Sequence, residues 1–355
     1  MTKSSSNQST TIAVTGAAGQ LGRLIVQRLI DDDTVQNILA IDLVEPDIKN
    51  QKLEWIKADI RDPRLSEKLT GVDVLMHLAF VVTKYLPRAE FDDINIEGSK
   101  NVFRAAAEAG VSQILYSSSL AAYGVCPGHP NPLIEESPRI LVAEFPYSAA
   151  KFRVEEFLDL FEAENKSIKV VRFRPSILVG ENLNNPLAQL FGRTLSRGYI
   201  VGASDMPMPI VWDEDVADAF ILAVQANAHG AYNLSAEPLH SPKEIARSLG
   251  MKVLHPGKIL NTVLDKVGRL RIRLGAQNAI DPAWGKHGDI PLAQSCAKAR
   301  TELGWKPKQE SGIDVIQKYL SVCGQQGNMD RKGKKLIFWP VIQLYSRISA
   351  RRNSL

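Results

Sequence analysis

The sequence predicts an α/β fold, in which helices cover both faces of a doubly wound parallel sheet and a smaller C-terminal lobe is interleaved with it. Through the first half of the chain, short apolar runs alternate with stretches that have the period of amphipathic helices. A glycine-rich loop directly follows the first apolar run. After Pro175 the helical stretches become shorter, and loops rich in asparagine, proline and glycine separate them. This change predicts a smaller lobe over the carboxyl edge of the sheet.

Six compact apolar runs, each bounded by Gly, Asp, Asn or Ser, are predicted to be strands. They are Thr11–Thr15, Ile38–Leu43, Leu53–Ile56, Val72–Leu78, Ile114–Ser117 and Val170–Phe173. Between the first two, the leucines and isoleucine of Leu21–Ile30 repeat at about 3.6 residues, the period of a helix packed on a sheet. A helix over Asp213–Ala226 and a strand over Ala231–Leu234 are expected to return the chain to this sheet.

The loop after the first strand carries three glycines at a spacing typical of dinucleotide binding. Gly16 would permit the tight turn, Gly19 would let backbone amides approach a pyrophosphate, and Gly22 would let the helix pack closely. The phosphates would then lie at the positive N-terminus of the helix, where Gln20 and Leu21 are also expected to bind the cofactor.

Asp42 indicates which dinucleotide binds. It ends the second strand, twenty residues beyond Gly22, where a carboxylate suits the two ribose hydroxyls of NAD and would repel the extra phosphate of NADP. No arginine lies in the segment 42–45. The sequence therefore favours NAD over NADP.

Tyr147 and Lys151 are predicted to be the catalytic pair. A helix that begins behind Pro146 places residues four apart on one face. A lysine beside a tyrosine, with a cationic nicotinamide nearby, is expected to lower the phenol pKa from about 10 and make Tyr147 a usable acid or base. Ser119 belongs to a serine cluster that begins with Ser117 at the end of the fifth strand, and it is expected to orient the reacting oxygen.

Together these motifs resemble an extended short-chain dehydrogenase/reductase of the NAD-dependent epimerase/dehydratase family, whose main domain has a Rossmann-type sheet. The resemblance covers roughly Thr11 to Leu320. It is carried by Thr15-Gly16-x-x-Gly19-x-x-Gly22, Asp42, Asp59-Ile60, His77-Leu78-Ala79, Asn95, Tyr116-Ser117-Ser118-Ser119 with Tyr123-Gly124, Tyr147-x-x-x-Lys151 and Arg174-Pro175.

The resemblance also implies further cofactor contacts. For Asn95 a helix cap is the alternative, and for His77 a hydrogen-bonded histidine at the end of a strand is the expected role. The implied contacts are Asp59 and Ile60 beside the adenine, Leu78 and Ala79 along the cofactor cleft, and Asn95, Ser117 and Pro175.

Several positions depart from the sugar-nucleotide enzymes of this family. The dehydratases carry an Asp-Glu pair after the catalytic hydroxyl, and this chain has Leu120 and Ala121 there. Epimerases have an asparagine and an arginine that contact the nucleotide diphosphate, and this chain has Ile177 and Met208. The segment Gly202–Ile210 is correspondingly apolar. These departures favour a weakly polar substrate, as in the hydroxysteroid-dehydrogenase and ketone- or aldehyde-reductase branches.

The leading hypothesis is therefore an NAD-linked hydride transfer at a secondary alcohol or ketone of a small molecule. A nucleotide-sugar 4-epimerase, which oxidises and then reduces one carbon while its cofactor stays bound, is the alternative. A non-catalytic NAD sensor or scaffold is the second alternative, although it would not need to retain Ser119, Tyr147 and Lys151.

The predicted domains follow from this order. Residues 1–10 form a polar, disordered arm, residues 11–175 with about 211–237 form the NAD-binding domain, about 176–210 with 238–325 form the substrate lobe, and 326–355 form a basic amphipathic tail.

The net charge of +4 originates in that tail, because Arg331–Leu355 holds seven basic and no acidic residues. Its apolar segment Leu336–Tyr345 is shorter than the roughly 20 residues that span a bilayer. Docking on the enzyme or on a second subunit and peripheral contact with a membrane both remain open. The basic, apolar stripe Ile259–Leu270 likewise allows core packing, a lid or a membrane contact.

The remaining composition excludes several partners. No basic patch with interleaved aromatic residues runs through the body of the chain, so nucleic acid is not expected. Cys126, Cys296 and Cys323 are far apart and outside any metal-type spacing, which predicts neither a metal site nor a disulfide. We expect a cytoplasmic protein, with a membrane surface as the location that the tail leaves open. Homodimers are common among the proteins that it resembles.

Overall fold

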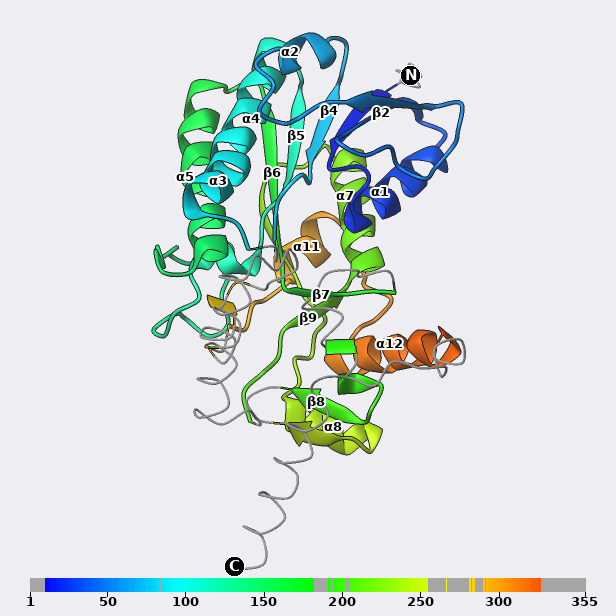
Figure 1. The fold of residues 1–355 in the computed structure, drawn as a ribbon, viewed down its shortest axis with the longest axis vertical. Helices are drawn as coiled ribbons and strands as arrows, with labels where there is room; N and C mark the ends of the chain where they lie inside the picture. Colours follow the sequence, from blue (N-terminus) through cyan, green and yellow to red (C-terminus); the bar gives the residue numbers. More distant parts are fainter. Residues whose placement is uncertain are drawn as a thin grey trace, which may run out of the picture.

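The computed structural model describes residues 10–82, 85–181, 191–192, 194–201, 205–254, 266, 281, 283–284, 290 and 292–326. Its largest element is a seven-stranded parallel sheet with the order β10-β6-β5-β4-β1-β2-β3 (Figure 1). The strands are β1 Thr10–Thr15, β2 Val35–Asp42, β3 Leu53–Lys57, β4 Val74–His77, β5 Gln113–Ser117, β6 Lys169–Pro175 and β10 Gly230–Leu234. Two small parallel sheets pair β7 Ile177–Val179 with β9 Ile210–Trp212, and β8 Tyr199–Val201 with β11 Lys252–Leu254.

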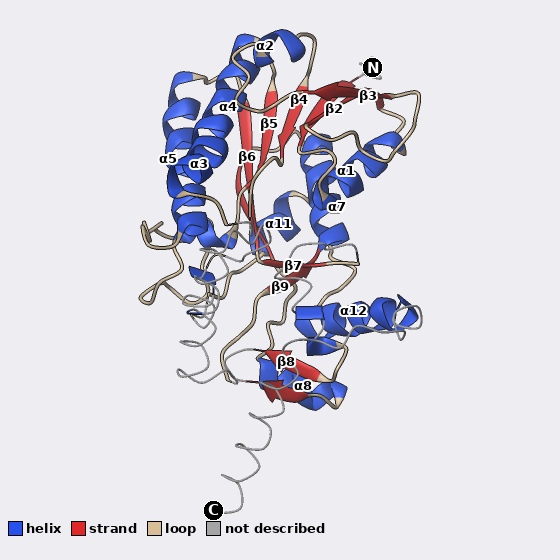
Figure 2. Cartoon of the chain, in the orientation of Figure 1, coloured by secondary structure: helices blue, strands red, loops and turns tan. Residues whose placement is uncertain are grey.

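Helices lie on both faces of the large sheet (Figure 2). In chain order the helices are α1 Gln20–Ile30, α2 Leu65–Lys68, α3 Arg88–Asp92, α4 Gly98–Glu108, α5 Pro146–Glu164, α7 Asp213–Gln225, α8 Pro242–Leu249, α11 Ala297–Glu302 and α12 Gly312–Gln326. A π-helical turn, Asp93–Glu97, joins α3 to α4, and a 3-10 turn, Leu120–Tyr123, follows β5.

The strand order reverses at β1. From β1 the chain builds β2 and β3 on one side, and it then returns to build β4, β5, β6 and β10 on the other. Ligands of such sheets bind beyond the carboxyl ends of the strands at the point of reversal. The loops that follow β1 and β4 therefore lie at the expected position of a ligand site. The predicted doubly wound α/β fold is confirmed.

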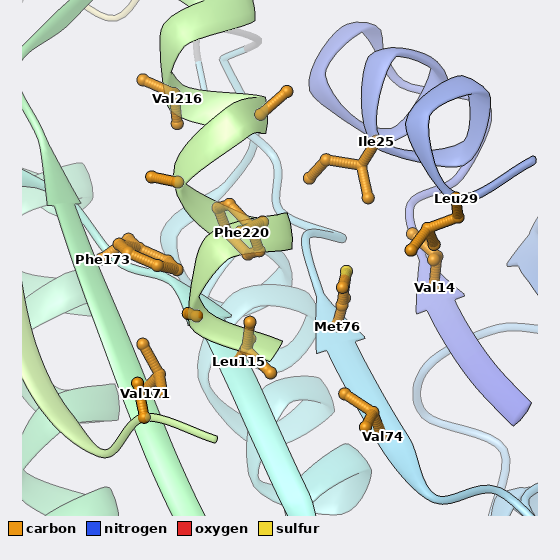
Figure 3. Close-up of a cluster of buried hydrophobic side chains, with 14 of the residues drawn as sticks. Val14, Ile25, Leu29, Val74, Met76, Leu115, Val171, Phe173, Val216 and Phe220 are labelled. Carbon is orange, nitrogen blue, oxygen red and sulfur yellow. The ribbon is translucent and has the colours of Figure 1, made fainter. Parts of the chain in front are cut away.

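Two layers of buried apolar side chains hold the helices on the sheet. On one face, α1 and α7 cover the sheet, and Phe220 of α7 packs against Phe173 of β6 with ring centres 4.5 Å apart (Figure 3). On the other face, Phe103 of α4 and Phe161 of α5 belong to a second cluster. The apolar faces predicted from helical periodicity thus point toward the sheet from both sides.

A smaller group of elements lies beyond the carboxyl ends of the strands (Figure 1). Its own buried cluster joins β7, β8 and β9 to α8 and α12, with Trp212, Ile245 and Ile316 among its members. From β9 the chain runs directly into α7 and returns to the large sheet, where β10 pairs with β6. The chain therefore passes between the two groups more than once.

Several predicted segments lie outside the described residues. They are the N-terminal arm apart from Thr10, the stripe 259–270 apart from Lys266, the part 202–204 of the apolar loop, and the basic tail beyond residue 326. Within the described part of the chain, no helix has both the length and the apolar character that crossing a membrane requires.

Candidate active site

Two glycines of the loop after β1 leave no room for a side chain. Gly16 has a φ of +73°, and a Cβ there would lie 2.7 Å from the backbone nitrogen of Ala79, just after β4. A Cβ on Gly22, in the first turn of α1, would lie 2.2 Å from the carbonyl oxygen of Gly16. The loop therefore packs directly on α1 and on the segment that contains Leu78 and Ala79.

The N-terminus of α1 faces this loop without a capping side chain. Gly19 occupies the capping position, so the first backbone N–H groups of the helix, those of Gln20 and Leu21 included, have no partner within the helix. Asp42, at the end of β2, lies beside the loop, and its carboxylate accepts a hydrogen bond from the backbone nitrogen of Ala18 at 3.0 Å. Orphan N–H groups and a carboxylate thus flank one turn, as the sequence predicts for a dinucleotide.

Asp59 and Ile60 follow β3, farther along the same edge of the sheet. The Asp59 carboxylate pairs with the Arg61 guanidinium, 2.6 Å between Oδ2 and Nη2, and these hydrogen bonds lower the pKa of Asp59. Ile60 is buried against Gly98 at the start of α4, where a Cβ would lie 2.8 Å from the Ile60 Cδ1 atom. Gly98 therefore makes room for the Ile60 side chain.

Two buried polar residues hold the segments around β4. His77 is hydrogen-bonded through Nδ1 to Thr15 Oγ1 (2.7 Å) and through Nε2 to Ser99 Oγ (2.9 Å), and burial lowers its pKa to about 3. Asn95 lies in the π-helical turn and caps no helix. Its amide accepts a hydrogen bond from the backbone nitrogen of Val81 (2.7 Å) and donates one to the Val81 carbonyl (3.0 Å). Asn95 therefore fixes the chain just beyond Leu78 and Ala79.

Tyr147, Lys151 and Ser119 come together where β5 ends and α5 begins. Pro146 is the first residue of α5, which places Tyr147 and Lys151 on successive turns. The Ser119 side chain lies close enough to the Tyr147 phenol to lower its pKa. The Lys151 ammonium donates to the carbonyl of Ser117 at 2.7 Å and lies 5.9 Å from the centre of the Tyr147 ring. The predicted catalytic residues thus form one cluster at the carboxyl edge of the sheet.

The expected lowering of the Tyr147 pKa by Lys151 and a cationic nicotinamide stays a prediction, because it depends on the bound cofactor. Burial raises the pKa of Tyr147, and the nearby Ser119 side chain opposes this only in part. The Lys151 ammonium donates its hydrogen bonds to the Ser117 carbonyl and to the Tyr116 hydroxyl, 3.2 Å away. Burial also lowers the pKa of Lys151.

Glu155 opposes this loss of charge at Lys151. It lies one turn further along α5, fully buried, and accepts hydrogen bonds from Arg174 (3.0 and 2.5 Å), Arg139 (3.0 Å) and Ser118 (2.5 Å). Burial alone would raise the pKa of Glu155, but Arg174 and Ser118 hold it at about 2. The Glu155 carboxylate opposes the effect of burial on the pKa of Lys151 and thus favours the charged form of Lys151.

Among the described residues, three aromatic rings lie beside the Tyr147 ring. The ring centres of Trp284, Phe80 and Phe145 lie 5.0, 5.8 and 6.2 Å from that of Tyr147. The Lys151 ammonium lies 3.5 Å from the centre of the Phe80 ring, so Phe80 joins both members of the predicted pair. The immediate surroundings of Tyr147 are therefore largely apolar.

The positions that depart from the sugar-nucleotide enzymes contribute no charge. Leu120 and Ala121 are buried in the 3-10 turn after Ser119. Ile177 is 53% exposed on β7, and the backbone nitrogen of Met208 donates to the His240 carbonyl. Pro175, a predicted cofactor contact, ends β6 and pairs with Leu234 of β10.

Sequence reasoning missed Glu155, Phe80, Trp284 and Asp213. Glu155 could have been found, since it lies four residues after Lys151 on the same face of a predicted helix. Asp213, the first residue of α7, is hydrogen-bonded to the side chain of Gln20 across 193 positions of sequence. No local pattern indicates such a contact, and none indicates that Trp284 lies beside Tyr147.

The comparisons with known proteins agree with this architecture. A model of the NAD dependent epimerase/dehydratase family matches residues 12–235. An uncharacterised protein of Mycobacterium tuberculosis is 28% identical over 316 residues, which are 82% of this chain but only 31% of that relative. A Monkeypox virus protein described as 3 beta-hydroxysteroid dehydrogenase/Delta 5→4-isomerase is 38% identical over 130 residues, or 34% of this chain and 37% of the viral protein.

A solved structure of UDP-glucose 4-epimerase from Thermotoga maritima has a similar fold. The TM-score is 0.67 and the identity 20%, with 90% of this chain and 100% of that chain covered.

Proposed function

Because the chain belongs to the NAD dependent epimerase/dehydratase family, we propose that it is an NAD-dependent oxidoreductase that acts on a secondary alcohol or ketone of a weakly polar substrate. The observation that carries this proposal is the cluster of Ser119, Tyr147 and Lys151 beside the loop after β4.

The residues around the loop after β1 fit NAD. The absence of a Cβ at Gly16 and Gly22, together with the free N–H groups at the start of α1, leaves a turn whose backbone can bind a pyrophosphate. Asp42 would accept hydrogen bonds from the ribose hydroxyls and would repel the extra phosphate of NADP. Leu78 and Ala79, fixed by Asn95 through Val81, would line the cofactor on the opposite side. Bound there, NAD would supply the hydride acceptor.

Each polar residue of the cluster would then have one task. Ser119 would donate a hydrogen bond to the substrate oxygen and hold it beside Tyr147. Tyr147 would take the hydroxyl proton during oxidation and return it during reduction. Glu155 opposes the effect of burial on Lys151, and the charged form of Lys151 would lower the energy of the phenolate. Burial raises the pKa of Tyr147 in the protein alone. A cationic nicotinamide would oppose that rise, as would the charge of Lys151.

The aromatic surroundings of Tyr147 support a weakly polar substrate. Phe80, Phe145 and Trp284 offer apolar ring faces within 6.2 Å of the Tyr147 ring centre. Leu120 and Ala121 lack the acid and base that a dehydration would need. The partial similarity to the viral protein described as a hydroxysteroid dehydrogenase also supports this substrate class.

Replacing Tyr147 with Phe tests the proposal. The variant keeps the ring and its contacts but removes the proton-exchanging hydroxyl, so we expect turnover to fall by at least about 10²-fold. NAD affinity, measured by calorimetry, should change less than about twofold, which corresponds to under ~0.5 kcal/mol. Tyr85→Phe, the same change at a 39% exposed tyrosine, is the control and should keep full turnover. Undiminished turnover in Tyr147→Phe would refute the proposed role.

A further inference from the structure

A buried carboxyl group, that of Asp213, contacts the first residue of the helix that follows the glycine loop. Asp213, the first residue of α7, is 3% exposed. Its carboxylate accepts a hydrogen bond from the Gln20 side-chain amide and, through Oδ1, one from the backbone nitrogen of Glu214 at 2.9 Å. The Asp213 carboxylate packs against Gly180, since a Cβ at that position would lie 1.9 Å from Asp213 Oδ2. The carboxyl group is thus confined between α1, α7 and the end of β7.

Gln20 connects this carboxyl group to the expected pyrophosphate site. It is the first residue of α1 and directly follows Gly19, so its backbone N–H belongs to the free amides of the helix N-terminus. The side-chain amide of the same residue donates a hydrogen bond to the Asp213 carboxylate. Asp213 therefore lies about one glutamine side chain away from the position where two phosphate charges would bind.

Among the described residues, no positive charge pairs with Asp213. From α1 comes the neutral amide of Gln20, from α7 the carboxylate of Glu214, and after β7 comes Gly180. Arg28 of α1 pairs with Glu214 and Asp218, and no ion pair among the described residues reaches Asp213. Burial is the main cause that raises the pKa of Asp213 to about 6, and Glu214 adds to it.

We propose that Asp213 is a proton-linked residue of the dinucleotide site, so that a pyrophosphate binds at the glycine loop more tightly when Asp213 is protonated than when it is ionised. This inference rests on the NAD site proposed above. A buried carboxylate and a pyrophosphate one side chain apart repel each other, because little water screens them. The protonated carboxyl group keeps an oxygen that accepts the Gln20 amide while it loses the repulsive charge. Binding of NAD and protonation of Asp213 therefore favour each other.

The proposed coupling predicts the direction in which NAD affinity changes with pH. Asp213 is largely protonated below pH 5 and largely ionised above pH 7, because its pKa is about 6. If NAD raises this pKa by about one unit, its Kd should weaken roughly sixfold between pH 5.5 and 7.5, and binding near pH 6.5 should take up on the order of half a proton. A merely structural role for Asp213 would produce no proton uptake.

Calorimetric titration of the whole protein with NAD, in two buffers of different ionisation enthalpy, measures this uptake. Wild type should take up protons near pH 6.5. Asp213→Asn, a neutral isostere that still accepts from Gln20, should take up none and should keep the tight affinity across the pH range. Asp218→Asn is the matched control, because it removes a carboxylate from the same helix that contacts Arg28 instead of Gln20, and it should retain the uptake.

The outcomes separate this inference from the proposed function. Absence of proton uptake in wild type, or equal uptake in Asp213→Asn, overturns the role of Asp213. Should Asp213→Asn fail to fold, Glu214→Gln still tests it: removing the neighbouring charge should move the uptake to lower pH, and an unchanged pH profile overturns the role. Failure of wild type to bind NAD at any pH contradicts the cofactor assignment itself, and with it this inference.

Discussion

At the scale of single residues, the ion pair of Glu155 and Arg174 illustrates how burial and charge compete. The Glu155 carboxylate has a pKa of about 2 in the folded protein, below the ordinary value of 4.5. Its ionisation therefore stabilises the fold at pH values above about 4.5, and this contribution is lost as the pH falls toward 2. The same anion supports the charge of Lys151, so stability and the catalytic cluster depend on one buried group.

Glu155→Gln should therefore lower the free energy of unfolding. Arg174 would be left buried beside a neutral amide, which typically costs about 3 kcal/mol or more. Urea unfolding at pH 7 measures this loss, and the difference from wild type should shrink below about pH 4.5. Glu162→Gln, in the same helix but paired with Arg172 and 33% exposed at its side chain, should lose less than about 1 kcal/mol. Equal losses in the two variants would contradict the account.

At the scale of elements, the contact between Gly22 and Gly16 decides how closely α1 approaches the loop after β1. Alanine in a helix is normally about 1 kcal/mol more favourable than glycine, so a gain in stability would be expected at an unconstrained position. For Gly22→Ala we expect a loss instead, since the new Cβ would lie 2.2 Å from a backbone oxygen. Thermal unfolding without NAD measures whether the substitution raises or lowers the stability. Gly19→Ala is the control with the smaller expected loss, because its Cβ would lie 3.1 Å from the same oxygen. A stabilised Gly22→Ala would contradict the packing described.

Local elements were predictable because their signals are local. The run Val170–Phe173 and the helix behind Pro146 were placed correctly. The structure extends the strand to Lys169–Pro175, because β5 pairs with it from Lys169 and β10 pairs with it as far as Pro175. The cluster of Ser119, Tyr147 and Lys151 was predictable since each residue lies at the edge of such an element. The burial of Tyr147, which raises its pKa in the protein alone, was not predictable, because it depends on how distant segments pack around its ring.

At the scale of the whole molecule, the candidate site is assembled from segments that are distant in sequence. The glycine loop follows β1, the catalytic pair opens α5, and Trp284 reaches Tyr147 from the C-terminal part of the chain. Asp213 and Gln20 join the two helices that cover one face of the sheet. Such contacts depend on how the elements pack, so the sequence pattern alone could not indicate them. The reversal of strand order at β1 gathers these segments at one edge.

The formation of NADH by the purified protein tests the central claim most directly. The protein would be incubated with NAD and, in separate reactions, with sugar nucleotides, apolar cyclic secondary alcohols and small hydroxy compounds, while NADH absorbance is followed. We predict net NADH formation with an apolar secondary alcohol, because Ser119, Tyr147 and Lys151 lie beside the rings of Phe80, Phe145 and Trp284. Interconversion of a sugar nucleotide by protein that retains its NAD, without net NADH, would contradict it.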